Sequence, residues 1–206
     1  MFERLGGFPI LKRLLEGLVK SPVRHVVLEV SRHCDSRCIS CDTWKTRGHH
    51  AEDLTRTQQK EALSRLAEAG CRSVSLHGGE PLLCPHLSEL VEHASLLGMR
   101  TTITTNSLSM TPQRAKRLVD AGLDGIRFSL DGSEEDNNYL RGRKYAFQKT
   151  VQAISYVQGS DTSGRVEKII RTNVCQRNLP RIEEVLDIAH DTGIRRVQIT
   201  YYSFLD

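Results

Sequence analysis

The sequence has no long apolar run and no excess of charge of one sign. None of its hydrophobic stretches approaches the roughly 18 residues that a membrane-spanning helix requires. Its N-terminus lacks the apolar segment and small-residue cleavage site of a secretory signal. The net charge of +4 arises from 29 basic and 25 acidic residues that are interspersed along the chain. We therefore expect a cytoplasmic protein with no nucleic-acid or membrane partner.

Low-complexity segments and repeats longer than one strand–helix unit are also missing. Hydrophobic residues make up 38% of the 206 residues, which is enough for one domain with a sizeable core. Six cysteines in a cytosolic chain of this length are better explained as metal ligands or buried apolar residues than as disulfides.

The first 20 residues alternate apolar and basic positions, and their leucines fall on one helical face. This pattern predicts a helix packed on the domain, with a membrane-surface or partner-binding helix as the alternative. We expect residues 1–22 to form an N-terminal helical extension and residues 23–206 to form the core domain.

Beyond residue 22, strand-like and helix-like segments alternate. Six runs have strand character, at residues 25–31, 72–79, 100–106, 125–132, 166–174 and 195–202. Five segments have helical periodicity, at residues 54–70, 86–98, 111–122, 144–159 and 179–193. Such alternation predicts an α/β fold of parallel strands joined by right-handed crossovers, as a doubly wound sheet or part of a βα barrel.

Polar clusters follow the predicted strands, at residues 32–44, 77–81, 104–107, 129–132 and 173–178. In both candidate folds, chemistry takes place at the carboxyl ends of parallel strands. We therefore expect these clusters to meet at one end of the sheet.

The first of these clusters contains Cys34, Cys38 and Cys41 in a C-x3-C-x2-C pattern. Structural zinc sites usually use two pairs of ligands, and only one C-x2-C pair is present here. A histidine among His33, His49 and His50 would complete a zinc site, so zinc stays an alternative. Three thiolates on one loop also suit a [4Fe–4S] cluster, in which one iron is then left without a protein ligand.

The remaining cysteines are expected to be ordinary residues. Cys71 follows the predicted helix end at Gly70, and Cys175 ends a predicted strand. Cys84 has no cysteine partner nearby in the sequence, although it is expected to lie nearer the site than the other two.

A C-x3-C-x2-C loop after the first strand of a βα series resembles the signature of the radical S-adenosylmethionine (radical SAM) superfamily. Three further segments resemble that family in the same order: HGGEPLLCPHLSELVEHA (77–94), TTN (104–106) and SLDGSEEDNNYLRG (129–142). The last resembles the branch that holds the molybdenum-cofactor cyclase and the SPASM peptide maturases. The resemblance covers residues 25 to about 200, and it implies a partial (β/α)6 TIM-like barrel with an N-terminal helix.

The resemblance also implies a mechanism. In the family, the amino and carboxylate groups of SAM bind the open iron of a [4Fe–4S] cluster. An electron from the cluster cleaves SAM, and the resulting 5′-deoxyadenosyl radical takes a hydrogen atom from the substrate. Cys34, Cys38 and Cys41 would be the cluster ligands, and no residue is assigned as catalytic.

The implied SAM contacts are Gly78, Gly79, Glu80, Thr105, Asn106, Ser129 and Arg141. The two glycines would let the backbone approach SAM closely, and Glu80 would accept a hydrogen bond from its ammonium. Thr105 and Asn106 would lie near the ribose or the substrate.

The fourth motif implies two further contacts with SAM. Ser129 would bond SAM, and Arg141 would clamp its carboxylate, unless it is a solvated surface residue. Asp131 is expected to form the turn of this motif. Asn173 and Asn178 are weaker candidates for the lining of the site.

One position departs from the family pattern. Ser40 stands where the family usually has an aromatic residue beside the adenine. Trp44 is the only tryptophan, and it either stacks on the adenine instead or is an ordinary core or surface residue.

The resemblance implies a radical SAM enzyme that acts on an unidentified small molecule or peptide, with an electron donor such as flavodoxin or ferredoxin. A glycyl-radical activase and a non-catalytic iron–sulfur or zinc-binding relative are the alternatives. No cysteine follows Cys175. Auxiliary clusters are therefore expected to be absent, unless the natural chain continues beyond Asp206.

Overall fold

The computed structural model describes residues 23–45 and 54–201. The helix expected within residues 1–22 lies outside the described residues, as do His49 and His50. The extension and the domain boundary at residue 23 are therefore still predictions.

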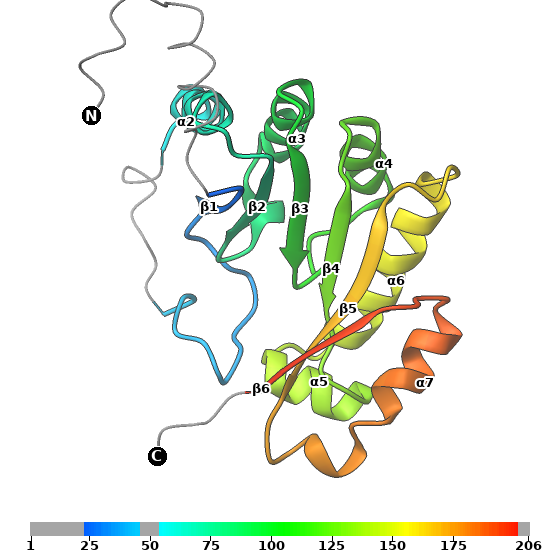
Figure 1. Ribbon diagram of the computed structural model, residues 1–206. Helices are drawn as coiled ribbons and strands as arrows, with labels where there is room; N and C mark the ends of the chain where they lie inside the picture. The colour runs from blue at the N-terminus through cyan, green and yellow to red at the C-terminus, as the bar shows by residue number, and fades with distance from the viewer. Residues whose placement is uncertain (1–22, 46–53, 202–206) are drawn as a thin grey trace, which may run out of the picture.

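The described chain forms one sheet of six parallel strands in the order β1-β2-β3-β4-β5-β6 (Figure 1). The strands are β1 (His25–Ser31), β2 (Ser73–Gly78), β3 (Arg100–Thr105), β4 (Gly125–Ser129), β5 (Glu167–Val174) and β6 (Val197–Tyr201). Because each strand pairs with the next one in the chain, the sheet grows in one direction. This is the order of a partial barrel rather than that of a doubly wound sheet, and it confirms the expected fold class.

Helices connect the strands and cover one face of the sheet. They are α2 (Arg56–Glu68), α3 (Leu87–Leu96), α4 (Pro112–Asp120), α5 (Glu134–Arg141), α6 (Ala146–Ser160) and α7 (Glu184–Asp191). Among these residues, none of the helices has the length and hydropathy needed to cross a bilayer. Short 3-10 turns at Pro81–Leu83 and Leu179–Arg181 precede α3 and α7.

Two of the helices expected from the sequence begin at capped residues. Thr55 caps α2 in a capping box with Gln58. Thr111 caps α4, and Pro112 occupies the first turn, where its missing N–H is harmless.

Within the described residues there are six helices rather than the expected five, because α5 lies between residues 132 and 144, where no helix was expected. The Ser133 hydroxyl accepts a hydrogen bond from the Asp136 N–H, and the first turn is acidic, which suits the positive end of a helix dipole. Gly142 ends the helix in the left-handed conformation, with φ of 62°. The residues expected to begin a helix at 179 form a 3-10 turn instead, and α7 begins at Glu184.

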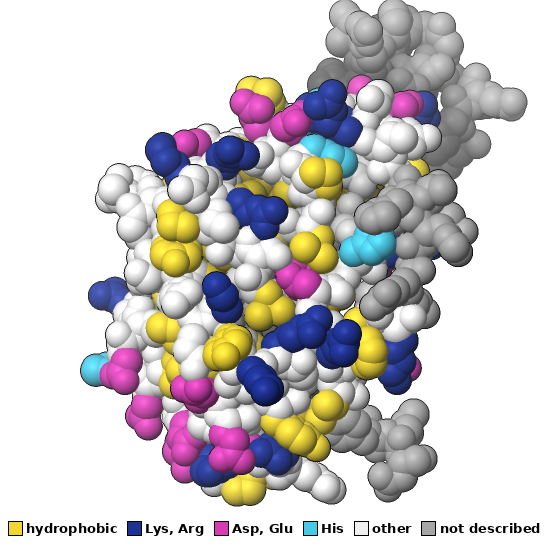
Figure 2. All heavy atoms as spheres, turned by 180° about the vertical axis from the view of Figure 1, so that it is seen from behind, with side chains coloured by type: hydrophobic (Ala, Val, Ile, Leu, Met, Phe, Trp, Pro, Cys, Tyr) yellow, Lys and Arg dark blue, Asp and Glu magenta, His cyan; other side chains and the backbone are white. Residues whose placement is uncertain are grey.

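The core lies between the sheet and its helices. Leu76, Ile103 and Phe128, from three neighbouring strands, are fully buried against helix residues such as Leu90 and Ile154. The opposite face of the sheet is more open, since Val27 on β1 is 61% exposed. In Figure 2, which shows the molecule from behind, basic and acidic side chains are interspersed over the surface.

Candidate active site at the carboxyl end of the sheet

The loop of residues 32–45 carries the three clustered cysteines and leaves β1 at the carboxyl end of the sheet (Figure 1). Three hydrogen bonds fasten it to the last carbonyls of α5: from Arg37 N at 3.1 Å, from Ile39 N at 3.0 Å and from Ser36 Oγ at 2.9 Å. A Cβ on Gly142 would lie only 2.2 Å from the Arg37 carbonyl oxygen. The loop and the end of α5 are therefore in direct backbone contact.

Cys34, Cys38 and Cys41 are half-buried free thiols. The Cys38 and Cys41 thiols donate to hydroxyl oxygens of Ser36 at 3.5 Å and Thr43 at 3.2 Å. Burial raises the pKa of the Cys34 thiol to about 11. The loop thus holds three free cysteines, two of which are hydrogen-bonded to hydroxyl groups.

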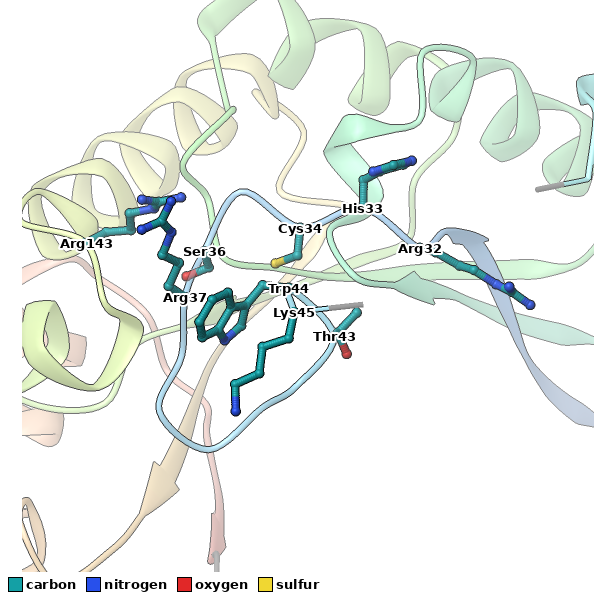
Figure 3. Close-up of a pocket in the computed structure, with 9 residues that line it drawn as sticks. All are labelled: Arg32, His33, Cys34, Ser36, Arg37, Thr43, Trp44, Lys45 and Arg143. Carbon is teal, nitrogen blue, oxygen red and sulfur yellow. The ribbon is translucent and has the colours of Figure 1, made fainter. Parts of the chain in front are cut away.

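The described residues contain no cluster of three His, Cys, Asp or Glu side chains that is already arranged around a metal. The set of three thiols fits an iron–sulfur cluster in kind, because such clusters are held by thiolates. The loop must draw its sulfurs together to hold one. In Figure 3 the His33 side chain points away from the Cys34 sulfur, so it gives no support to a zinc site there.

Gly78 and Gly79 pack directly under the start of the loop. A Cβ on Gly78 would lie 2.1 Å from the Ser31 carbonyl oxygen, and one on Gly79 would lie 2.3 Å from the His33 carbonyl oxygen. Gly79 N donates to Ser31 O at 2.8 Å, and Glu80 N donates to His33 O at 2.7 Å. In the described structure, the close approach that these glycines permit is therefore to the backbone of the loop.

Glu80 is almost completely buried, with 1% exposure. Its carboxylate accepts hydrogen bonds from Leu82 N at 3.0 Å, Thr105 Oγ1 at 2.7 Å and Asn106 N at 2.7 Å. Burial raises its pKa to about 7, although these three donors act in the opposite direction. The structure thus places Thr105 and Asn106 as direct partners of Glu80.

Asn106 also connects Glu80 with the loop. Its side-chain Nδ2 donates to Asp35 Oδ1 at 2.7 Å and lies 3.7 Å from the Cys34 sulfur. Ser109 Oγ donates to the second Asp35 oxygen at 2.7 Å. Sequence reasoning missed Asp35, and its position directly after Cys34 was the available signal.

Arg141 is a buried residue, which rules out the surface alternative. Its guanidinium fork binds Asp131, with Nε 2.7 Å from Oδ2 and Nη2 2.8 Å from Oδ1. Its third nitrogen, Nη1, lies 4.0 Å from the Cys38 sulfur. Asp131, which was expected to form the turn of this motif, is also the ion-pair partner of Arg141 and accepts from Asn173 N at 2.8 Å.

The other predicted residues lie at the same end of the sheet. Ser129 is buried at the end of β4. Asn178 is buried, and its side chain donates to the carbonyls of Asp131 at 2.7 Å and Asn173 at 2.9 Å, so it holds backbone rather than lining an open site. The predicted residues therefore lie close together, and several of them already form hydrogen bonds with one another.

A cavity of about 460 Å³ lies beside Cys34 (Figure 3). Among the residues that the structure describes, its lining includes the basic side chains of Arg32, Arg37, Lys45 and Arg143, and no carboxylate. Such a lining suits an anionic group, and an iron–sulfur cluster with three thiolates is anionic in its reduced state.

Trp44 also lines this cavity. Its indole Nε1 donates to Cys38 O at 3.1 Å, and its ring lies 5.9 Å from the Arg37 guanidinium carbon and 5.7 Å from Lys45 Nζ. The tryptophan is therefore part of the loop's own structure at the edge of the cavity.

The other cysteines differ in position. Cys84 is buried and shares with Cys34 the lining of a second cavity of about 690 Å³. Cys71 is more buried than expected, with 2% exposure, and Cys175 is half-buried as expected.

Comparison with known proteins agrees with this geometry. A family model described as the radical SAM superfamily matches residues 28–166. A PqqA peptide cyclase of Bradyrhizobium diazoefficiens is 28% identical over 183 residues, which are 87% of this chain and 47% of the relative. An Fe-coproporphyrin III synthase of Methanosarcina barkeri is 29% identical over 178 residues, which are 86% of this chain and 43% of the relative. The chain thus spans about half the length of the curated relatives it matches.

Solved structures show the same fold. Streptococcus suis SuiB bound to S-adenosylmethionine aligns with a TM-score of 0.73 and 22% identity, covering 95% of this chain and 44% of SuiB. The structure of anSMEcpe with bound AdoMet aligns with a TM-score of 0.70 and 18% identity, covering 87% of this chain and 51% of anSMEcpe. At these identities the likeness concerns the fold alone.

Proposed function

The chain belongs to the radical SAM superfamily, and from that premise we propose that Cys34, Cys38 and Cys41 hold a [4Fe–4S] cluster for the reductive cleavage of SAM. When bound, such a cluster supplies the electron that cleaves SAM and yields a 5′-deoxyadenosyl radical, which takes a hydrogen atom from the substrate. The protein's own part is to hold the reactants and shield them.

One observation carries the proposal. The cysteine loop is fastened to the end of α5, and the same loop contacts the Gly78-Gly79-Glu80 segment of β2. Three thiols, a buried carboxylate and a basic cavity therefore meet at the carboxyl end of one parallel sheet. Chemistry is concentrated at that end in βα folds.

Glu80, Arg141 and Ser129 would each have a separate role at the site. Within the described part of the chain, Glu80 Oε2 accepts one hydrogen bond, which leaves a lone pair for the ammonium of SAM. Arg141, held by Asp131, directs its remaining nitrogen toward Cys38 and would stabilise the thiolate form of that ligand. Ser129 would bond SAM from the end of β4.

The substrate is proposed to be a peptide or a small molecule. The similar proteins include a PqqA peptide cyclase and an Fe-coproporphyrin III synthase, so relatives of both kinds support this range. We also propose a reduced flavodoxin or ferredoxin as electron donor, a cytoplasmic location, and a core domain that spans residues 23–206.

The experiment is anaerobic reconstitution of the whole chain, followed by iron, sulfide and zinc analysis. The parent should bind about four iron and four sulfide per chain. Cys34→Ala, Cys38→Ala and Cys41→Ala should each lose the cluster, while the matched control Cys175→Ala, which replaces another half-buried free thiol, should retain it. One bound zinc without iron would contradict the proposal.

A second measurement separates an active enzyme from a non-catalytic relative. Adding SAM to the reduced protein should change the cluster's electron paramagnetic resonance spectrum, and dithionite should then yield 5′-deoxyadenosine. Cluster assembly without either response would favour the non-catalytic alternative.

A further inference from the structure

The open face of the sheet carries two arginines on neighbouring strands. Side chains alternate between the two faces of a strand, and those of Ile126 and Ile170 are buried on the helix side. Arg127 on β4 and Arg171 on β5 therefore point to the other side. The register pairs Ser129 with Arg171, which places Arg171 one side-chain step closer to the carboxyl end than Arg127.

These two arginines differ from the other arginines around them. Arg100 forms an ion pair with Glu167 at 2.6 Å, and Arg196 is paired with the same carboxylate. Within residues 23–45 and 54–201, no ion pair engages Arg127 or Arg171. Glu167 is thus already shared by two guanidinium groups, and two more remain without a carboxylate.

Within the described residues, the hydrogen bonds of these two arginines also lack a carboxylate acceptor. Arg127 Nη1 donates to a neutral oxygen, Thr102 Oγ1, at 3.2 Å. Arg171 Nε is buried and has no hydrogen-bond acceptor among the described residues. A buried N–H without an acceptor is destabilising, so a ligand that supplied an acceptor to Arg171 would remove this cost on binding.

The charged groups near Arg127 and Arg171 are also mostly positive. Burial lowers the pKa of Arg127, and the charges of Arg100, Arg171 and Arg196 lower it further. On β2, burial lowers the pKa of His77, with Arg171 adding to the effect and Glu29 opposing it. The face therefore has an excess of positive charge, with His77 neutral near pH 7.

We propose that Arg127 and Arg171 bind a carboxylate group of the substrate. Planar guanidinium groups match carboxylates in geometry and form charge-assisted hydrogen bonds with them. Because Arg171 is opposite Ser129 in the register, a carboxylate held there lies next to the residue proposed to bond SAM. The role of this site in catalysis rests on the proposed function, whereas the binding of the carboxylate does not require the cluster.

The test measures the binding of two matched pairs of probes by isothermal titration calorimetry. One pair is glutarate and glutaramide, which have the same shape but differ in charge. The other is the blocked tripeptide Gly-Glu-Gly and its Gly-Gln-Gly counterpart. Each probe is titrated into the reconstituted protein and into cluster-free protein, and SAM affinity and iron content are measured in parallel.

The variants are Arg127→Gln and Arg171→Gln, with Arg100→Gln as the control, because it removes an arginine of the same face that already has a carboxylate. The parent should bind the acid of at least one pair more tightly than its amide. Arg127→Gln and Arg171→Gln should each weaken that binding about tenfold to a hundredfold, the effect of losing a charge-assisted hydrogen bond. Arg100→Gln should leave it nearly unchanged.

The outcomes separate this proposal from the previous one. Preference for glutarate alone identifies a small-molecule acid, and preference for the Glu tripeptide identifies a peptide side chain. No preference for an acid, or equal losses in all three variants, overturns the proposal. A loss of SAM affinity in Arg171→Gln with unchanged acid binding also overturns it, because the arginine would then serve SAM. Acid binding without any cluster assembly would instead contradict only the proposed function.

Discussion

Replacing Glu80 by Gln should remove a pH-dependent loss of stability from the cluster-free protein. Burial raises the pKa of Glu80 from 4.5 to about 7. A carboxyl group with a raised folded-state pKa stabilises the fold fully below its unfolded-state pKa. This contribution is lost as the pH rises through the folded-state pKa. At about 1.4 kcal/mol per pKa unit, the contribution of Glu80 to the free energy of unfolding should fall by about 3 kcal/mol across this window.

The amide of Gln has the same shape as the carboxyl group but does not titrate. Its NH2 group would meet one of the N–H donors from which the carboxylate now accepts, and this clash should add a pH-independent penalty of about 1–3 kcal/mol to the variant. The difference between parent and variant isolates the titration of Glu80, since all other groups cancel.

The assay is urea unfolding of both proteins between about pH 5 and about pH 8. The difference in the free energy of unfolding, parent minus Glu80→Gln, should shrink by about 3 kcal/mol as the pH rises. Glu89→Gln is the control, because ion pairing with Lys60 lowers the pKa of Glu89 and moves its titration below this window. A difference that stays constant or grows with pH would mean that the three donors, rather than burial, dominate the pKa of Glu80.

Two further predictions concern backbone contact and ion pairing, and both are measured by urea unfolding. Gly79→Ala should lower the free energy of unfolding by about 1–3 kcal/mol because its Cβ meets the backbone of the loop. The control Gly159→Ala, in open space within α6, should raise it by about 0.5–1 kcal/mol. Equal effects of the two substitutions would refute the close contact between Gly79 and the loop. Asp131→Asn should lower the free energy of unfolding by about 3–5 kcal/mol, because it leaves Arg141 buried without a counter-charge. The control Asp120→Asn, which breaks an exposed ion pair with Lys116, should lower it by at most about 1 kcal/mol. Similar losses at both sites would show that the buried pair is not held as described.

The strands could be predicted because short β-branched runs between turn residues are strong local signals. All six predicted strands exist, and their sequential order follows from the regular alternation with helices. Helix α5 was missed because its eight residues, EEDNNYLR, show no apolar stripe. Its capping residue Ser133 and its contact with the cysteine loop stabilise it, and only the first of these is visible in the sequence.

The sequence indicated that the candidate residues lie at one end of the sheet, but it did not indicate which of them pair with each other. Asp131 and Arg141 are ten positions apart, and nothing in that spacing shows that the end of β4 and the end of α5 bring them together. The contact between Asp35 and Asn106 joins positions 71 apart and depends on how β1 and β3 sit in the sheet. Long-range pairings of this kind are fixed by register and packing, which a local pattern does not contain.

The contact between the cysteine loop and α5 also sets an order of events during synthesis. The loop hydrogen bonds join residues that lie about 100 positions apart in the chain. At a translation rate of roughly 5–20 residues per second, Cys41 is made about 5–20 s before Arg141. During that interval the three thiols belong to a nascent chain without the helix that fixes their loop. The proposed cluster could therefore be held by the fastened loop only after Arg141 has been made, and the thiols are vulnerable to oxidation until then.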